Sequence, residues 1–245
     1  MSLLKILGID FFCGTLADSI NFARKGGLIV APSGPGLACD LKNSYYYEAL
    51  RNADLVIPDS GFMCLWVNFF GKNKIKRISG FAFLKSFLDQ FESFDSSFWI
   101  MPDEIQDISH RTWINESYGV KILDYQTYIA PTYERVKKIN DDMLLGKIKK
   151  LKPNVIFIQI GGGIQESLGF FLKQKLNYNP SIICTGAALA FLSGEQAKIP
   201  KWADRFYLGW FFRCLKSPKV FVPRYFKAIR LAYLLLRFGS EFPSK

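Results

Sequence analysis

The sequence alternates short apolar runs, most of which end at Gly, Pro or Asp, with longer stretches of helix-like, amphipathic spacing. Continuous apolar runs are typical of parallel strands buried on both faces, and strand–helix alternation builds a parallel sheet. We therefore predict an α/β fold with a Rossmann-like, mostly parallel sheet and helices on both faces. The predicted strands are Leu3–Ile9, Leu28–Ala31, Leu55–Ile57, Phe98–Met101, Val120–Leu123, Val155–Ile160 and Ser181–Cys184.

The intervening stretches predict helices, and the alternation stops after Gly186. Residues 200–237 show only helical spacing, with interruptions expected near Pro218 and Pro223. We divide the chain into an α/β core, residues 1–197, and a C-terminal basic helical appendage, residues 198–245. The predicted helices of the core are Leu16–Arg24, Gly36–Asn52, Gly61–Phe70, Ala82–Phe91, Tyr133–Lys150 and Gln165–Leu176.

Positive charge is concentrated at the C-terminal end. The chain has a formal net charge of +11, and from Lys198 onward eleven Lys and Arg residues face only two acids. At helical spacing the basic residues of Arg224–Phe238 share one face, a pattern typical of helices that lie on an anionic membrane surface. The alternative is a solvated basic face on a helix that packs against the core.

Rare residue types exclude several classes of protein. A single histidine, His110, leaves no room for histidine-based metal sites or a Ser-His-Asp triad. The five cysteines show no C-x-x-C spacing, as expected for a reduced, cytoplasmic protein. No run approaches the roughly 20 apolar residues that span a bilayer, so any membrane contact would be peripheral.

Flexible and polar residues follow four of the predicted strands. In open α/β sheets ligands bind beyond the carboxyl ends of the strands, so these segments are expected to meet along one rim. They are Pro32-Ser-Gly-Pro-Gly36, Pro58-Asp-Ser-Gly61, Gly161-Gly-Gly-Ile-Gln-Glu166 and Thr185-Gly-Ala187.

Each of these segments has two interpretations when taken alone. Asp59 suits a general base that accepts a proton from a hydroxyl, but it equally suits the N-cap of the following helix. Gly161–Gly163 would let a phosphate approach a helix N-terminus, or would form only a tight turn. The glycines do not complete a G-x-G-x-x-G dinucleotide motif. Thr185-Gly186 has the same turn interpretation.

With these segments assembled, the chain resembles the WecG/TagA/CpsF family of bacterial glycosyltransferases almost from end to end. The order and spacing of several short motifs carry the resemblance. They are Ile6-Leu-Gly-Ile9, Asn52-Ala-Asp-Leu-Val-Ile-Pro-Asp-Ser-Gly61, Arg77-Ile-Ser-Gly-Phe81, Lys152-Pro-Asn-Val-Ile-Phe-Ile158, Gly161 with Gln165-Glu166, Phe191-Leu-Ser-Gly194, Lys198-Ile-Pro200, Trp202, Leu208-Gly-Trp210 with Arg213, and Pro218 leading to Arg224-Tyr225.

The resemblance implies an inverting transferase that moves an N-acetylmannosamine-type or related sugar from a UDP-sugar to a polyprenyl-diphosphate-linked acceptor, in cell-surface polysaccharide biosynthesis. It places the enzyme at the inner face of the membrane and leaves open whether the chain forms a homo-oligomer. We expect no metal cofactor, because Asp54 and Asp59 are too far apart in sequence for a D-x-D pair.

The resemblance also assigns roles to residues of this chain. It makes Asp59 the general base and places Gln165 near the reacting groups. Arg213 and Arg224 would come from a C-terminal segment that covers the site and stabilises the departing UDP. The remaining substrate-binding residues would be Ser33, Arg77, Gly161, Gly162, Glu166, Thr185 and Gly186.

This chain departs from the family pattern around the expected sugar site. Ala31-Pro-Ser33 stands where the family has Thr-Pro-Asn, Ala82 replaces an Asp, and Gly162-Gly-Ile164 replaces Ala-Pro-Lys. These changes favour a divergent member with a different donor, and a non-catalytic relative stays open. A nicotinamide-dependent oxidoreductase would use the glycine turns for a pyrophosphate, and a nucleic-acid-binding protein would use the basic tail, although we expect no nucleic-acid partner.

Overall fold

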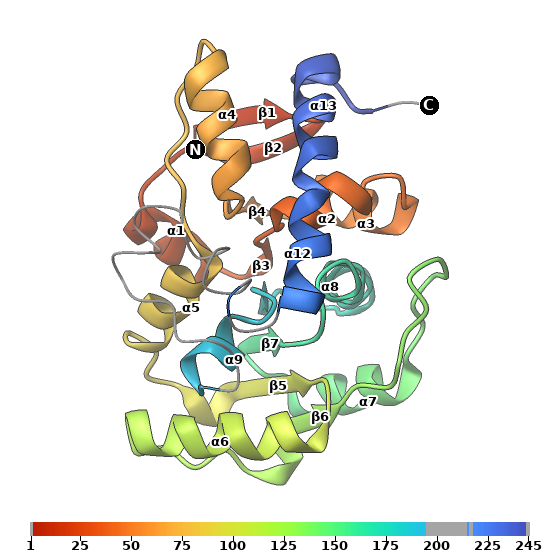
Figure 1. Cartoon of the computed structure of the whole chain (residues 1–245). Coiled ribbons are helices and arrows are strands. Elements are labelled where there is room, and N and C mark those ends of the chain that lie inside the picture. Colours follow the sequence, from red (N-terminus) through yellow and green to blue (C-terminus); the bar gives the residue numbers. More distant parts are fainter. Residues whose placement is uncertain (1, 195–214, 216–217, 244–245) are drawn as a thin grey trace.

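The computed structural model describes residues 2–194, 215 and 218–243, and it confirms the α/β architecture (Figure 1). Six parallel strands form one sheet in the order β4-β3-β8-β7-β5-β6. Two further strands, β1 (Leu3–Ile6) and β2 (Ile9–Phe12), form a separate antiparallel hairpin. The strands of the main sheet are β3 (Gly27–Val30), β4 (Leu55–Val56), β5 (Ser97–Met101), β6 (Thr127–Ile129), β7 (Val155–Ile158) and β8 (Ser181–Cys184).

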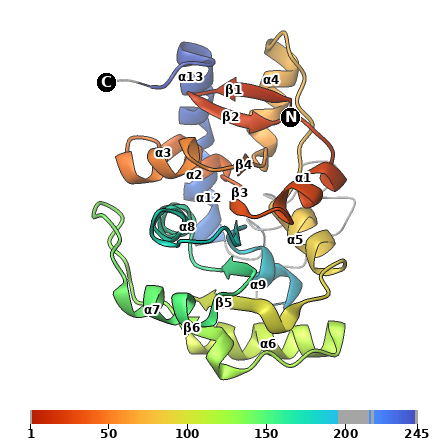
Figure 2. The ribbon, with the colours of Figure 1, turned by 180° about the vertical axis from the view of Figure 1, so that it is seen from behind.

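Helices cover both faces of the main sheet (Figures 1 and 2). One face packs against α2 (Gly34–Cys39), α3 (Ser44–Arg51), α4 (Gly61–Phe70), α7 (Asp142–Leu151), α8 (Ile164–Lys175) and α13 (Ala228–Phe238). The other packs against α1 (Leu16–Ala23), α5 (Gly80–Leu88), α6 (Glu104–Tyr118) and α9 (Ala188–Leu192). Two short 3₁₀ turns, Phe94–Ser96 and Asp124–Gln126, precede β5 and β6, and α12 (Pro218–Phe226) leads into α13.

The strand register brings the predicted site segments to one edge. Val30 is paired with both Val56 and Cys184, while Ile158 is paired with both Cys184 and Ile100. The four inner strands, β3, β5, β7 and β8, consist entirely of buried residues, as their continuous apolar runs predict. Their carboxyl ends are therefore level, and the segments that follow them lie side by side.

The first predicted strand is wrong as a single element. Leu3–Ile9 is divided by a two-residue turn at Leu7 and Gly8, both with positive φ, between β1 and β2. Two successive residues with positive φ match the right-handed twist of a hairpin. Gly8 adopts this conformation freely, and Leu7 is fully buried, so burial of its side chain offsets part of the backbone cost.

Two predicted helices are shorter than expected, because polar side chains cap helices that begin at later residues. Gly36–Asn52 is divided into α2 and α3, and the Asn43 side chain accepts the Tyr45 N–H at the start of α3. Tyr133–Lys150 becomes helical only from Asp142, because Asp141 caps α7 by accepting the Leu144 N–H.

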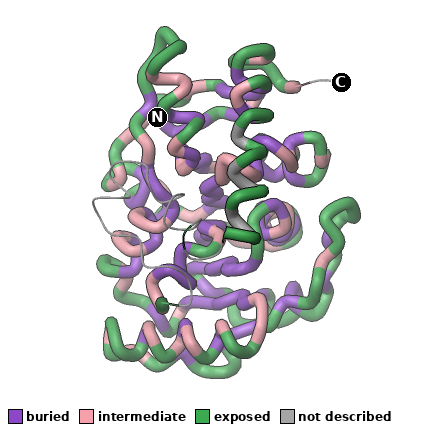
Figure 3. The backbone as a smooth tube through the Cα atoms, viewed as in Figure 1, coloured by how far each residue is buried: buried purple, intermediate pink, exposed green. Residues whose placement is uncertain are grey.

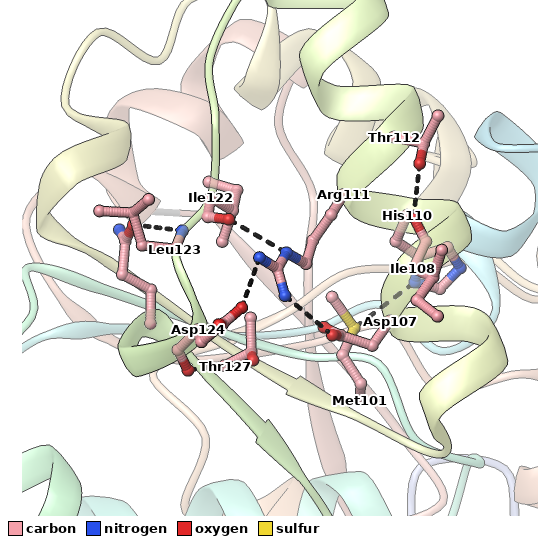
Figure 4. A network of polar contacts seen from close by, with 11 residues as sticks. Met101, Asp107, Ile108, His110, Arg111, Thr112, Ile122, Leu123, Asp124 and Thr127 are labelled. Atoms are coloured by element: carbon pink, nitrogen blue, oxygen red, sulfur yellow. Dashed lines mark hydrogen bonds and ion pairs between the residues drawn. The ribbon is translucent and has the colours of Figure 1, made fainter.

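The predicted strand Val120–Leu123 is an extended segment without strand pairing, and β6 begins four residues later. Side chains satisfy its backbone instead. Arg111 Nε donates to the Ile122 carbonyl over 3.0 Å, and the Gln126 side chain accepts the Leu123 N–H over 3.0 Å. Arg111 also pairs with Asp107 and Asp124 (Figure 4), which fixes α6, a helix that the sequence analysis missed, against this segment.

The described part of the C-terminal segment is helical, as predicted. Pro223 lies inside α12 rather than interrupting it, and the break falls at Lys227. Leu231, Leu234 and Leu235 of α13 are buried in the same core as the sheet. The following Gly239 and Ser240 carbonyls accept N–H groups from the β1–β2 turn. The predicted domain boundary at residue 198 lies outside the described residues and stays a prediction.

Candidate active site

A cavity of about 860 Å³ runs across the carboxyl edge of the sheet, from the end of β4 to the end of β5. Residues along α5, the turn before α8 and residues along α9 complete its walls. It lies where ligands bind in open α/β sheets. Nine of the predicted site residues line it: Ser33, Asp59, Arg77, Gly161, Gly162, Gln165, Glu166, Thr185 and Gly186.

The two other predicted site residues belong to the C-terminal segment. Arg213 and the Arg224 side chain lie outside the described part of the chain, and the Arg224 backbone belongs to α12. Their predicted role as a cover over the site therefore stays a prediction.

Asp59 lies at the lip of the cavity, between β4 and α4. Ser60, not Asp59, caps α4, because the Ser60 hydroxyl accepts the Met63 N–H over 3.3 Å. The structure therefore removes the N-cap interpretation of Asp59. Its side chain instead binds the N-terminus of α5, where Oδ1 accepts the Gly80 N–H over 3.1 Å.

Arg77 holds Asp59 at two points. Arg77 Nε donates to the Asp59 carbonyl over 2.8 Å, and Nη2 lies 3.5 Å from Asp59 Oδ1. About a quarter of the Asp59 side chain stays accessible. The carboxylate is thus fixed in orientation yet open to the cavity, the arrangement that a general base requires.

The turn between β7 and α8 offers open backbone to a ligand. A side chain at Gly161 or Gly162 would meet nothing within 4 Å among the described residues. Gly163 differs, because its φ is +90° and a Cβ there would lie 3.0 Å from Arg135 Nη1. Glycine is therefore required by the fold at position 163, whereas positions 161 and 162 leave room for a substrate.

Gln165 and Glu166 form a buried brace beneath two turns of the cavity. Gln165 Oε1 accepts the Gly186 N–H over 2.8 Å, and its Nε2 donates to Glu166 Oε1 over 3.1 Å. Glu166 Oε2 accepts the Gly163 N–H over 2.6 Å. Burial raises the pKa of Glu166 from its ordinary 4.5 to about 7. These contacts link the turns after β7 and β8.

The two hydroxyl residues of the predicted site differ in their engagement. The Ser33 hydroxyl caps α2 by accepting the Gly36 N–H over 3.3 Å. Thr185 directly follows β8 and is buried, and its Oγ1 has no hydrogen-bond partner among the described residues. Thr185 Oγ1 is therefore available to a ligand in the cavity.

Sequence reasoning missed several polar groups at the cavity, including the Gly80 N–H and Gln159. The Gly80 N–H, at the first turn of α5, belongs to a quoted motif but was not assigned to the site. Gln159 lies within the predicted apolar strand Val155–Ile160, although it follows β7 and lines the cavity. A polar residue at the end of an otherwise apolar strand is the signal that marks such a position.

A parallel sheet with a polar cavity along its carboxyl edge defines an α/β protein that binds its ligand at the strand ends. Comparison with known proteins narrows this class. The chain belongs to the family described as "Glycosyl transferase WecG/TagA/CpsF family", whose sequence model matches residues 4–242. The protein is therefore a glycosyltransferase, as the motifs predicted.

Two curated relatives carry the same name, N-acetylglucosaminyldiphosphoundecaprenol N-acetyl-beta-D-mannosaminyltransferase. The Bacillus spizizenii protein is 24% identical over 222 residues, which cover 84% of this chain and 79% of the relative. The Bacillus subtilis protein is 23% identical over 204 residues, which cover 80% of this chain and 74% of the relative.

The described residues also bear on membranes and metals. Within residues 2–194, 215 and 218–243, no helix combines the length and apolar character needed to cross a bilayer. The same residues contain no cluster of three or more His, Cys, Asp or Glu side chains suited to a metal ion. The expectation of a metal-free reaction stays a prediction.

Proposed function

We propose that this glycosyltransferase moves an N-acetylmannosamine-type or related sugar from a UDP-sugar to a polyprenyl-diphosphate-linked acceptor, with inversion at the anomeric carbon. The observation that carries the proposal is the Asp59 carboxylate, which Arg77 and the Gly80 N–H orient at the edge of the cavity. The named activity of the two relatives supports the choice of acceptor and sugar.

Asp59 performs the proton transfer in this proposal. It accepts the proton of the acceptor hydroxyl while the hydroxyl oxygen bonds to the anomeric carbon and the bond to UDP breaks. The Gly80 N–H and the Arg77 guanidinium orient the carboxylate toward the cavity. The Asp59 carboxylate is therefore already oriented before the acceptor binds.

The departing UDP carries the charge that develops at the leaving oxygen. The turn at Gly161 and Gly162 supplies accessible backbone at the N-terminal end of α8, where the helix dipole favours an anion. Thr185 lines the same cavity. We assign the diphosphate to this part of the cavity, with Arg213 and Arg224 as further cations.

The lipid-linked acceptor requires the site to face a membrane, and one surface suits this. The α4–α13 face consists of two neighbouring helices (Figure 1) with exposed Leu65, Phe69 and Phe70 on α4, and exposed Ile229 and Leu236 on α13. Exposed cations adjoin both sets: Lys72, Lys74 and Lys76 follow α4, and Arg230 and Arg237 lie on α13.

Apolar side chains flanked by cations match the interface of an anionic bilayer. The outer side of α13 is exposed along much of its length (Figure 3). Because α4 begins two residues after Asp59, this face leads directly to the lip of the cavity. We therefore propose a peripheral protein on the inner, cytoplasmic leaflet, with this face toward the lipid.

A binding panel tests the chemical class. Thermal shifts with UDP, UDP-sugars, GDP-sugars and NAD should show stabilisation by uridine nucleotides only. A transfer assay with a polyprenyl-diphosphate-linked N-acetylglucosamine acceptor should then give product from a UDP-sugar. Stabilisation by NAD alone would favour the oxidoreductase alternative and contradict the proposal.

Vesicle flotation tests the membrane face. The double variant Phe69→Ser/Phe70→Ser should release the protein from anionic vesicles. The matched control is Ile105→Ser/Ile108→Ser, which removes two exposed apolar side chains from α6, at the opposite end of the molecule (Figure 1). Equal release of both variants, or equal binding to neutral and anionic vesicles, would contradict the assignment.

A further inference from the structure

Gln159 is an unusual residue on the cavity wall. It follows β7, only 5% of it is exposed, and it lines the cavity. Among the described residues, neither its Oε1 nor its Nε2 has a hydrogen-bond partner. Leaving both ends of a buried carboxamide unpaired costs free energy, so such a group indicates a ligand that pairs with it.

The strand register fixes the side of the sheet to which the Gln159 side chain points. The Gln159 N–H is bound to the Ile100 carbonyl, so Gln159 continues the β7 ladder by one residue. Side chains alternate along a strand, so Gln159 points to the same side as the core residue Phe157. Thr185 directly follows the neighbouring β8, and by the same alternation its side chain points to the side of the core residue Ile183. The two unpaired polar side chains are therefore neighbours on one face.

The distance along the sheet edge separates this subsite from the proposed reaction centre. Asp59 follows β4, and Gln159 follows β7, with β3 and β8 between them. Three strand spacings correspond to about 14 Å. Beyond Gln159 the cavity is walled by Pro102 and Gln106, and Phe191 and Leu192 of α9 lie on the same side.

Only one part of a UDP-sugar combines that distance with the right chemistry. A group that presents an N–H beside a C=O pairs with both ends of a carboxamide at once. A UDP-sugar has two such groups, the imide edge of uracil and an acetamido substituent on the sugar. The acetamido group is attached next to the anomeric carbon and so lies close to Asp59, whereas the diphosphate and ribose separate the base from that carbon.

We infer that Gln159 reads the donor's base, with its Oε1 accepting the uracil N3–H and its Nε2 donating to the neighbouring carbonyl. Gln159 is buried and the same cavity is lined by Phe191 and Leu192, and hydrogen bonds discriminate strongly in such water-poor surroundings. The inference rests on the proposed use of a UDP-sugar. It adds a base-binding subsite, formed by Gln159 at the β7–β5 end of the cavity.

Gln159→Leu tests the inference, because leucine has a similar volume and no polar atoms. By calorimetric titration, the dissociation constants of UDP, UDP-glucose and UDP-N-acetylglucosamine should all rise at least about 10-fold. Without nucleotide, the melting temperature should equal or exceed that of the wild type, since an unpaired buried carboxamide has been removed. Tyr178→Phe is the matched control, because it also removes an unpaired buried polar group but lies away from the cavity, and it should leave UDP binding unchanged.

Other outcomes would overturn the inference in distinguishable ways. Unchanged UDP binding by Gln159→Leu would remove Gln159 from the site, while the wild type's own UDP binding would leave the proposed function standing. Weaker binding of UDP-N-acetylglucosamine alone would indicate that Gln159 pairs with the sugar and not with uracil. A melting temperature more than about 4 °C below that of the wild type would make Gln159 a structural residue. Absence of uridine-nucleotide binding by the wild type would overturn the proposed function as well.

Discussion

Replacing Glu166 by Gln removes a titrating carboxyl from beneath the cavity floor with almost no change in size. In the wild type, Glu166 accepts N–H groups from Gly163 and Gln165, and burial raises its pKa from 4.5 to about 7. Nearby Asp40 raises the pKa further. The folded protein therefore keeps the Glu166 proton at pH values at which the unfolded chain has lost it.

The sign and size of the effect follow from this difference. Between pH 4.5 and about 7 the folded state binds more protons than the unfolded state, so the free energy of unfolding falls as pH rises. At about 1.4 kcal/mol for each pH unit, the loss is about 3 kcal/mol across the window. Stability is then flat above pH 7 with respect to this group.

Urea denaturation of the wild type and Glu166→Gln at half-unit pH intervals measures the effect. Other titrating groups act equally in both proteins, so the difference between the two free energies of unfolding isolates Glu166. The wild type should lose about 3 kcal/mol relative to the variant between pH 4.5 and 7. A difference that stays constant across this window, or grows in favour of the wild type, would refute the reasoning.

Three further predictions concern the site and the C-terminal helix. Arg77→Met should lower kcat/KM at least 10-fold by freeing Asp59, with UDP affinity within threefold of the wild type; equal kcat/KM would contradict the orienting role. Gly163→Ala should lower the free energy of unfolding by about 1–3 kcal/mol, because φ is +90° and the Cβ meets Arg135, whereas Gly162→Ala should not change it. Leu231→Ala, at a fully buried site of α13, should lower the free energy of unfolding by about 2–5 kcal/mol. The same substitution at the exposed Leu236 should lower it by less than about 0.5 kcal/mol. Equal losses in urea denaturation would contradict burial of α13 in the core.

The apolar pattern predicted the elements that are buried on all sides. The runs at Leu28–Ala31, Val155–Ile160 and Ser181–Cys184 became central strands because their hydrophobic content leaves no other location for them. Helix α6 lacked this signal, since two of its three buried residues, Asp107 and His110, are polar. Its contacts are divided between these polar side chains and Ile114, which is fully buried in the core.

The sequence likewise predicted where the site lies but not the contacts within it. Strand ends located the rim, since the carboxyl ends of parallel strands meet at one edge. The contacts that orient the side chains join residues far apart in sequence, such as the Gly80 N–H with Asp59 and the Gly186 N–H with Gln165. No local pattern encodes such pairs, so only the structure shows the Gln165–Glu166 brace and the contacts that orient Asp59.

The turnover of Asp59→Asn tests the central claim most directly. Asparagine keeps an oxygen that can accept the Gly80 N–H but cannot take a proton from the acceptor, so kcat should fall about 100- to 10,000-fold. UDP affinity and melting temperature should stay near those of the wild type. The control Asp10→Asn removes the same charge from the surface of β2 and should keep full activity. Near-normal turnover by Asp59→Asn, in a folded protein that binds UDP, would contradict the assignment of Asp59 as the base.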